Sequence, residues 1–188
     1  MSLSLPFLEA MTARDFFAFT DTRPDEEKWE LLDGIPVMNA TPSFLHQIVL
    51  KNLIALLFGL KRDRMRPWVA VPGFGLRITE TNVPVPDILV RPNTPLAGPE
   101  CDDAIVAIEI LSPSTAHEDR RLKRTLYAHL PSLQHYVIVA QDDAIVLSYE
   151  RREGFAERKI AGPGASLDIP ALEITLPLAD IYRGTGLS

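Results

Sequence analysis

Residues 105–127, IVAIEILSPSTAHEDRRLKRTLY, decide the fold of this chain because they join a buried strand to a helix. Residues 105–111 are apolar at every position except Glu109, a pattern typical of a strand that is covered on both faces. A carboxylate inside such a strand costs on the order of several kcal/mol unless a cation or hydrogen-bond donors receive it. We therefore expect a positive charge beside Glu109.

A helix is predicted to follow this strand and to start at about Thr115. Residues 112–115, Ser-Pro-Ser-Thr, stop the extended run, and Thr115 with Glu118 three residues later has the form of a capping box. The predicted apolar stripe consists of leucines that recur every fourth residue, Leu122, Leu126 and Leu130, with Tyr127 at its border. Lys123 lies next to this stripe, so we expect its stem to follow the core and its ammonium to reach toward the end of the strand.

Size and composition predict one domain, residues 1–188, because 188 residues with 46% apolar side chains can bury a proper core. The single cysteine, Cys101, excludes an intrachain disulfide and a thiolate-rich zinc site, and it favours a reducing compartment. The first residues do not read as a signal peptide, and the longest apolar run, 48–60, is interrupted by Lys51 and Asn52. We expect a soluble cytoplasmic protein with no membrane partner.

The formal net charge of −6 argues against a general nucleic-acid coat protein, because such binding requires many lysines and arginines to neutralise phosphates. Two local basic clusters exist, Arg120, Arg121, Lys123 and Arg124 in the predicted helix and Lys61, Arg62, Arg64 and Arg66 earlier in the chain. Counted alone, these clusters are more typical of solvated faces than of a nucleic-acid interface.

The first part of the chain predicts two helices and a hairpin. Thr12 with Asp15 has the form of a capped helix start, and Asp33-Gly34 between residues 29–32 and 35–38 is the signal for a type I′ hairpin, whose second strand Pro36 confines to an edge. A long helix opens at Ser43. Its predicted apolar positions are Leu45, Ile48, Val49, Leu53, Leu56, Leu57 and Leu60.

The remaining segments predict mainly strands. Those before the central strand are residues 68–71, 75–79 and 87–90, followed by a loop from 92 to 103. Those after the helix are residues 135–140 and 144–149, paired as a hairpin, then 155–160, then a strand around Leu172, Ile174 and Leu176 with a short closing helix through Ile181.

Two carboxylates and one lysine form a candidate site. Asp87 starts a predicted strand and Glu109 lies inside another, so the two converge on one hard cation if the strands are neighbours. Mg²⁺ or Mn²⁺ suits such oxygen ligands, polarises a phosphoryl oxygen and lowers the pKa of a bound water. Lys123, on the following helix, is suited to orient that water or to stabilise charge on a phosphate. This chemistry predicts hydrolysis of phosphodiester bonds.

These residues resemble the PD-(D/E)xK nuclease superfamily and within it the Uma-two family of restriction-endonuclease-like proteins. The resemblance is carried by Pro86-Asp87, by Glu109-Ile110-Leu111-Ser112-Pro113-Ser114-Thr115, and by Lys123 and Tyr127. It extends to Glu30-Leu31-Leu32-Asp33-Gly34, to His46 and to the C-terminal hairpin, and so covers most of the chain.

The resemblance implies a restriction-endonuclease-like mixed sheet flanked by helices, with additional N- and C-terminal hairpin strands. It implies Asp87 and Glu109 as metal ligands and Lys123 as the catalytic lysine, with Glu30, His46 and Tyr127 as secondary candidates. One departure from the superfamily pattern is present. The lysine usually stands two residues after the acid on the same strand, where this chain has Leu111, and Lys123 matches its relocation to the helix.

Each residue also has a structural alternative. Asp87 after Pro86 is also typical of a turn residue whose side chain binds nearby backbone amides. Lys123 is also typical of an exposed helix residue that forms an ion pair with Asp119, and such a pair contributes about 0.3–0.5 kcal/mol. Glu109 is also compatible with a buried pair to an arginine such as Arg77 or Arg120. His46, taken alone, is most typical of a histidine on a helix face that forms a local hydrogen bond. Residues 112, 114 and 115 are more typical of side chains that cap the backbone than of nucleophiles; they are Ser112, Ser114 and Thr115.

The first hypothesis is therefore a Mg²⁺-dependent endonuclease that acts on DNA, with weak or partner-dependent binding because of the negative charge. The second is a nuclease-fold protein that binds nucleic acid or protein without cleaving. A glycosidase with two carboxylates is weaker, because it leaves the lysine unexplained. A homodimer is expected, since duplex cleavage is often performed by two-fold pairs.

Overall fold

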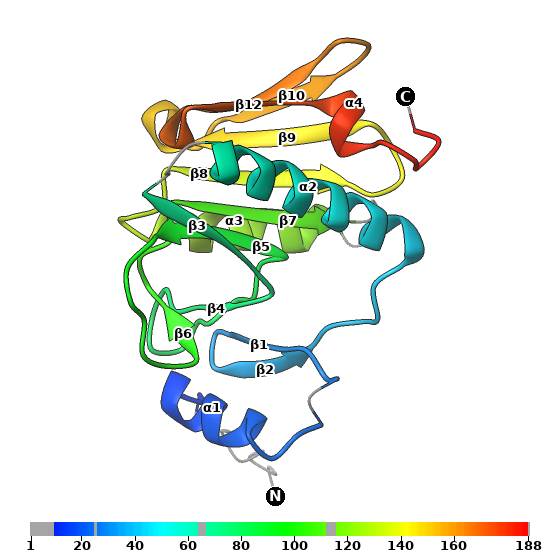
Figure 1. Cartoon of the computed structure of the whole chain (residues 1–188). Helices are drawn as coiled ribbons and strands as arrows, with labels where there is room; N and C mark the ends of the chain where they lie inside the picture. Colours follow the sequence, from blue (N-terminus) through cyan, green and yellow to red (C-terminus); the bar gives the residue numbers. More distant parts are fainter. Residues whose placement is uncertain (1–9, 25, 64–66, 112–115, 188) are drawn as a thin grey trace, which may run out of the picture.

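The buried strand around Glu109 is β7 (Val106–Leu111), and it occupies the middle of a six-stranded mixed sheet (Figure 1). The computed structural model describes residues 10–24, 26–63, 67–111 and 116–187. The strand order is β10-β9-β8-β7-β5-β3, built from β3 (Trp68–Pro72), β5 (Ile88–Pro92), β7, β8 (His135–Ala140), β9 (Ile145–Glu150) and β10 (Glu157–Ala161). Within this sheet β7 and β8 run parallel, and the other neighbouring strands run antiparallel.

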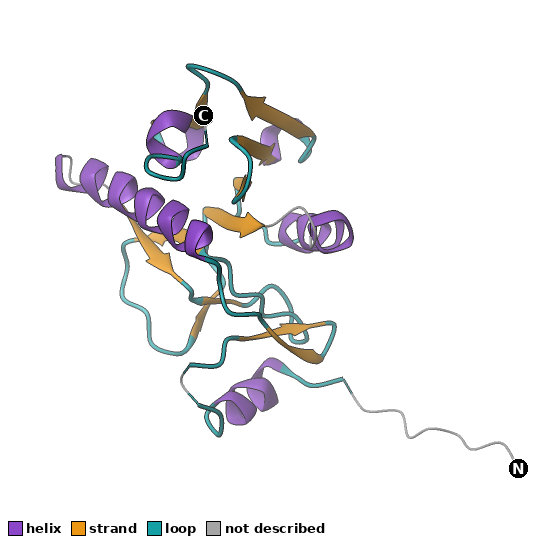
Figure 2. Cartoon of the chain, turned by 90° about the vertical axis from the view of Figure 1, so that its right-hand side faces the viewer, coloured by secondary structure: helices purple, strands orange, loops and turns teal. Residues whose placement is uncertain are grey.

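Two long helices cover the two faces of the sheet (Figure 2). α2 (Phe44–Asp63) packs Val49, Leu53 and Leu57 onto one face, and α3 (Ala116–Ala128), which connects β7 to β8, packs Tyr127 onto the other. Side chains alternate between the faces along β7, since successive residues of a strand point to opposite sides. Glu109 therefore points to the α3 side of the sheet.

The N-terminal segment forms a separate layer below the sheet in Figure 1. α1 (Ala13–Thr20) begins as predicted, since the Thr12 hydroxyl accepts a hydrogen bond from the Asp15 N–H at 3.3 Å. β1 (Trp29–Leu32) and β2 (Ile35–Met38) form the predicted hairpin, with φ of 49° at Asp33 and 76° at Gly34 as a type I′ turn requires. A Cβ at position 34 would lie 2.5 Å from Ala10 Cβ, so this turn needs glycine.

The C-terminal segment closes the α2 side of the sheet. β11 (Ser166–Ile169) and β12 (Ile174–Pro177) form a hairpin, joined by the short 3₁₀ turn η2 (Pro170–Leu172), and α4 (Leu178–Ile181) follows β12. Asn52 of α2 donates hydrogen bonds to the Ile181 carbonyl at 2.9 Å and to the Arg183 carbonyl at 2.8 Å. A second 3₁₀ turn, η1 (Arg151–Glu153), separates β9 from β10.

The expected fold class is confirmed: a mixed sheet flanked by helices, with extra hairpins at both ends. The strand predicted over 75–79 is shorter: β4 (Gly75–Leu76) pairs in parallel with β6 (Glu100–Cys101), which lies inside the predicted loop, and Thr79 forms only an isolated bridge with Asn82. Among the described residues no helix combines the length and the apolarity needed to cross a membrane.

The leucine stripe predicted for α3 is wrong at its first member, Leu122. Leu122 is 47% exposed, whereas Lys123 and Tyr127 are 4% and 0% exposed. These two polar side chains point inward and both reach Glu109. Leu130 is buried, but it lies beyond the end of α3 at Ala128. The capping box predicted at Thr115 lies outside the described residues.

Candidate active site

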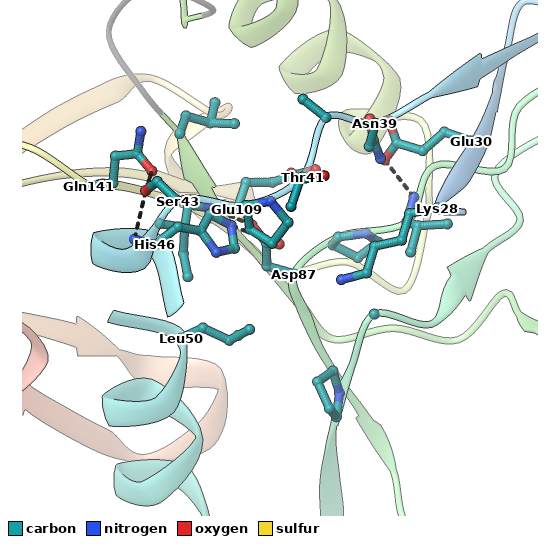
Figure 3. A pocket seen from close by; sticks show the side chains of 18 of the residues that line it. Lys28, Glu30, Asn39, Thr41, Ser43, His46, Leu50, Asp87, Glu109 and Gln141 are labelled. Atoms are coloured by element: carbon teal, nitrogen blue, oxygen red, sulfur yellow. Dashed lines mark hydrogen bonds and ion pairs between the residues drawn. The ribbon is translucent and has the colours of Figure 1, made fainter. Parts of the chain in front are cut away.

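The predicted site residues line one cavity of about 530 Å³ at the edge of the sheet where β7 ends (Figure 3). Its lining includes Glu30, His46, Asp87, Glu109 and Lys123. These residues come from the hairpin, from the first turn of α2, from the loop before β5, from β7 and from α3. The structure thus brings together residues that are far apart in the sequence.

Asp87 and Glu109 meet because β5 and β7 are antiparallel neighbours. The pairing ends at Ile88 opposite Ile108, and continuing this register by one residue sets Asp87 opposite Glu109. Beyond the last paired residues, the Ile110 N–H donates to Asp87 Oδ2 at 2.7 Å, so a side-chain carboxylate replaces the missing strand partner. The two acids therefore share a cavity, which the two-carboxylate hypothesis requires.

The environment of Glu109 meets the expectation of a nearby positive charge. The side chain is about 5% exposed, and its Oε1 accepts from the Tyr127 hydroxyl at 2.7 Å and from the Lys123 ammonium at 3.1 Å. Burial raises the pKa of Glu109 to about 8, even though the charge of Lys123 acts to lower that pKa. Burial thus disfavours the charged form of Glu109, and the charge of Lys123 offsets this effect only in part.

Lys123 lies between two acids rather than on the helix surface. Its ammonium is 3.2 Å from Glu30 Oε1, and the same oxygen of Glu30 accepts from the Val85 N–H at 2.8 Å. Glu30 and Lys123 are 2% and 5% exposed in their side chains. Glu30 therefore ties the N-terminal hairpin both to α3 and to the loop that carries Asp87.

His46 and Tyr127, the other secondary candidates, each contact one of the two acids. His46 Nε2 is 3.2 Å from Asp87 Oδ1, and Ser43 Oγ accepts the His46 backbone N–H at 3.1 Å, which matches the predicted helix start. Burial raises the pKa of Tyr127 well above its usual value, so its hydroxyl stays protonated and donates to Glu109.

The structure also bears on the structural alternatives for Glu109 and Asp87. Arg77 pairs with Glu100 at 2.8 Å and with Glu80 and Asp102, so it is not the partner of Glu109. The amide that Asp87 binds belongs to a neighbouring strand and not to a local turn. The side chains of Asp119 and Arg120 lie outside what the structure describes.

The carboxylates of the cavity suit a hard divalent cation that takes only one or two ligands from the protein. Among the described residues no group of three or more His, Cys, Asp and Glu side chains is arranged to hold a metal ion. Mg²⁺ commonly takes only one or two protein carboxylates and keeps several waters, and Asp87 and Glu109 supply two. The Asp87 side chain is 21% exposed, so it is open to the cavity. The buried Glu109 gains from an added positive charge.

The rim of the cavity contains polar residues that the sequence patterns did not indicate. They are Lys28, Asn39, Thr41, Ser43 and Gln141. Two of them, Lys28 and Asn39, could have been found from the register of the hairpin, which places both on the face that carries Glu30. In the structure the Asn39 N–H donates to the Lys28 carbonyl at 2.8 Å. Ser43 and Gln141 are linked by a side-chain hydrogen bond of 2.9 Å.

A family model described as "Putative restriction endonuclease", named Uma2, matches residues 13–179. The chain belongs to the Uma2 family. The resemblance stated from the sequence, to the Uma-two family, is confirmed. The match covers both hairpins and every candidate site residue of this Uma2 protein.

Two individual proteins are similar to this Uma2 chain. A solved structure from Anabaena variabilis ATCC 29413, titled as a "putative nuclease belonging to DUF820", superposes with a TM-score of 0.74 over 92% of this chain and 97% of the other, at 17% identity. That similarity is one of fold. "Uncharacterized protein slr1290" of Synechocystis sp. (strain PCC 6803) is 33% identical over 81 residues, which span 42% of this chain and 42% of that protein.

Proposed function

We propose that this Uma2 protein is a divalent-metal-dependent endonuclease that hydrolyses phosphodiester bonds of DNA. One observation carries the proposal: Asp87, directly before β5, and Glu109, in the neighbouring strand β7, line one cavity, and the Lys123 ammonium lies 3.1 Å from Glu109 Oε1. Two carboxylates that share a cavity with a lysine suit phosphoryl chemistry, in which charge must be stabilised and a water must be positioned.

In this proposal Asp87 and Glu109 would hold Mg²⁺ or Mn²⁺. The ion, when bound, supplies Lewis-acid polarisation of the phosphate and a water of lowered pKa. The Ile110 N–H holds the Asp87 carboxylate in place, and the Tyr127 hydroxyl does the same for Glu109. Both acids are therefore oriented before substrate enters, which lowers the cost of assembling the site.

Lys123 has the role of a charged donor in this mechanism. The attacking water forms a bond to phosphorus and releases a proton to solvent, while the bond from phosphorus to the leaving sugar oxygen breaks and that oxygen takes up a proton from solvent. Negative charge builds up on the phosphate oxygens during this step. An ammonium fixed by Glu30 and Glu109 can donate to the water and stabilise that charge without prior rearrangement. Glu30 acts here as a positioning residue.

Cleavage assays with two matched substrates test the proposal. Supercoiled plasmid and circular single-stranded DNA are incubated with the pure protein and Mg²⁺ or Mn²⁺, and the products are separated on a gel. We expect wild-type protein and Asp168→Asn, an exposed acid on β11, to cleave. We expect Asp87→Asn and Glu109→Gln to lose at least a hundredfold in rate, in line with the loss of one electrostatic group of an active site, about 10²–10³.

Equal cleavage by all four proteins would overturn the assignment of the site. DNA binding without any cleavage, and without Mn²⁺ binding by calorimetry, would support the second hypothesis of a binding protein with a nuclease fold. Homodimerisation and a cytoplasmic location remain predictions from the sequence, and sedimentation analysis of the pure protein tests the former.

A further inference from the structure

The wall of the cavity continues outward along one face of the hairpin. Glu30 is paired with Val37 and Leu32 with Ile35, so these four side chains share a face, and the Lys28–Asn39 pair extends it. We name the part of this face outside the cavity floor the hairpin shelf; it consists of Lys28, Leu32, Ile35, Val37 and Asn39. Two of its three apolar members are exposed, Ile35 at 63% and Val37 at 38%, and Leu32 is half-buried.

Lys28 adds positive charge at the mouth of a cavity with an acidic floor. It is exposed and lines the cavity, and Figure 3 shows it on the side opposite His46, with Asp87 and Glu109 between them. A nucleic-acid strand that delivers one phosphate to the two acids must place the next phosphate near the rim. A flexible ammonium at that point is suited to bind it.

The depth of the acids limits the shape of the substrate. The Glu109 side chain is about 5% exposed and the Asp87 side chain 21%, and the cavity volume of about 530 Å³ is in the range of small-molecule sites, about 300–1,000 Å³. A base-paired duplex is stiff, with a persistence length of about 150 bp, so bringing one of its phosphates to acids at this depth costs deformation energy. An unpaired strand bends at each nucleotide and can reach these acids at a smaller cost.

We propose that the substrate is an unpaired DNA strand, bound along the hairpin shelf, with Lys28 on the phosphate next to the scissile one and with Ile35 and Val37 against the adjoining sugar and base. This inference rests on the proposed function, which supplies the scissile phosphate. It adds the strand class and a specificity-determining surface.

Binding measured without metal tests the shelf separately from cleavage. The probe is a 5′-fluorescein single strand of mixed sequence, compared with the same sequence in a blunt duplex, and anisotropy is recorded in EDTA over a range of salt concentrations. For Lys28→Ala we expect weaker single-strand binding and a slope of log affinity against log salt that is smaller by about 0.7, the value for one phosphate contact on a single strand. Lys159→Ala, an exposed lysine on β10 at the far edge of the sheet, should leave the slope unchanged.

The apolar part of the shelf is tested by Ile35→Ser, with Phe58→Ser as control, because Phe58 is also exposed, at 51%, but lies on α2. We expect about threefold to tenfold weaker single-strand binding for Ile35→Ser alone, which corresponds to losing the burial of about one or two methylene groups. If Ile35→Ser changes only the sedimentation of the protein and not DNA binding, the shelf is a protein interface and the proposal is overturned.

Cleavage of substrates with and without unpaired segments completes the test. We expect Mg²⁺- or Mn²⁺-dependent cleavage of single strands and of overhangs, at least tenfold faster than cleavage of blunt duplex. Equal rates on both substrates, lost in Asp87→Asn, would overturn the strand class while supporting the endonuclease. Lys28-dependent binding of single strands with no cleavage of any substrate would support the shelf and overturn the proposed activity.

Discussion

The Lys123 ammonium lies 3.1 Å from Glu109 Oε1, and each of the two side chains is about 5% exposed. A pair buried to this degree is costly to break from one side only, because the remaining charge is left in a poorly solvated place. The geometry that we propose for catalysis is therefore also a contributor to the stability of the fold, and the two contributions can be measured separately.

Lys123→Met keeps the length of the stem but leaves Glu109 and Glu30 without their cation. We expect the free energy of unfolding to fall by about 3–5 kcal/mol at neutral pH, the usual cost of removing one partner of a buried pair. Urea unfolding followed by circular dichroism measures this, with Lys159→Met as a control in which an exposed lysine is lost. A cost equal to that of the control would show that the pair is not coupled to stability.

Tyr127→Phe removes one hydroxyl and leaves the ring, whose centroid is 4.7 Å from that of Tyr136. Because the lost hydrogen bond goes to a carboxylate, we expect a stability cost of about 1.5–3 kcal/mol and slower cleavage, since Glu109 is less well held. The control is Tyr182→Phe, whose hydroxyl donates to the Ile145 carbonyl at 2.7 Å, away from the cavity. It should lose stability but keep its cleavage rate, and equal effects on cleavage would contradict the role of Tyr127.

Two substitutions of Glu30 distinguish the contribution of its charge from the contribution of its hydrogen bond. Glu30→Gln keeps an oxygen that can accept from the Val85 N–H, whereas Glu30→Ala removes the acceptor of that part-buried amide and one of the two acids that contact Lys123. We expect a larger loss of stability for the alanine variant than for the glutamine variant, by about 1–3 kcal/mol. Chemical denaturation of both variants measures the difference, and indistinguishable midpoints would rule out the Val85 contact as a stabilising one.

The sequence predicted an element of the fold correctly wherever its local signals, such as a turn or a helix cap, agree with the packing of the core. The apolar run around Glu109, the Asp33-Gly34 turn and the capping of α1 by Thr12 each specify a local structure, and all three are observed. The same reasoning was sufficient to expect a cation beside Glu109, because a buried carboxylate without one is too costly.

Periodicity could not predict which face of α3 is buried. Leucines normally mark the core side of a helix, but the buried carboxylate of Glu109 selects Lys123 and Tyr127 and leaves Leu122 exposed. The partners of Asp87 and Glu30 depend on contacts between distant segments, namely Ile110, Val85 and α3, and no pattern within one element encodes these.

His135 should make stability depend on pH in a region remote from the cavity. It is 1% exposed and its Nε2 lies 2.8 Å from Ser148 Oγ, and burial lowers the pKa of His135 from 6.5 to about 4. A folded-state pKa below the unfolded one means that the stability contribution is present above pH 6.5 and is lost as the pH falls toward 4.

Compared with His135→Gln, we therefore expect the wild-type protein to lose about 2–3 kcal/mol over that interval, since one pKa unit corresponds to about 1.36 kcal/mol. Urea titrations at several pH values give the difference, and His129→Gln, which changes an exposed histidine and keeps His135, should lose as much stability over this interval as the wild type. A parallel pH dependence of wild type and His135→Gln would contradict the effect of burial.

Metal binding at Asp87 and Glu109 should be visible as thermal stabilisation, whether or not DNA is cleaved. An ion that binds only the folded state adds RT ln(1 + [L]/Kd), about 2.7 kcal/mol at a hundred times Kd, and about 2–4 °C of Tm accompanies each kcal/mol in a chain of this size. Asp87→Asn removes the charge but keeps an oxygen for the Ile110 N–H, so the loop before β5 should keep its position. We expect Mn²⁺ to raise the Tm of wild type and of Asp168→Asn by several degrees, and to leave Asp87→Asn and Glu109→Gln unchanged. If Mn²⁺ raises the Tm of all four proteins equally, the ion binds elsewhere, and the assignment of Asp87 and Glu109 as its ligands is overturned.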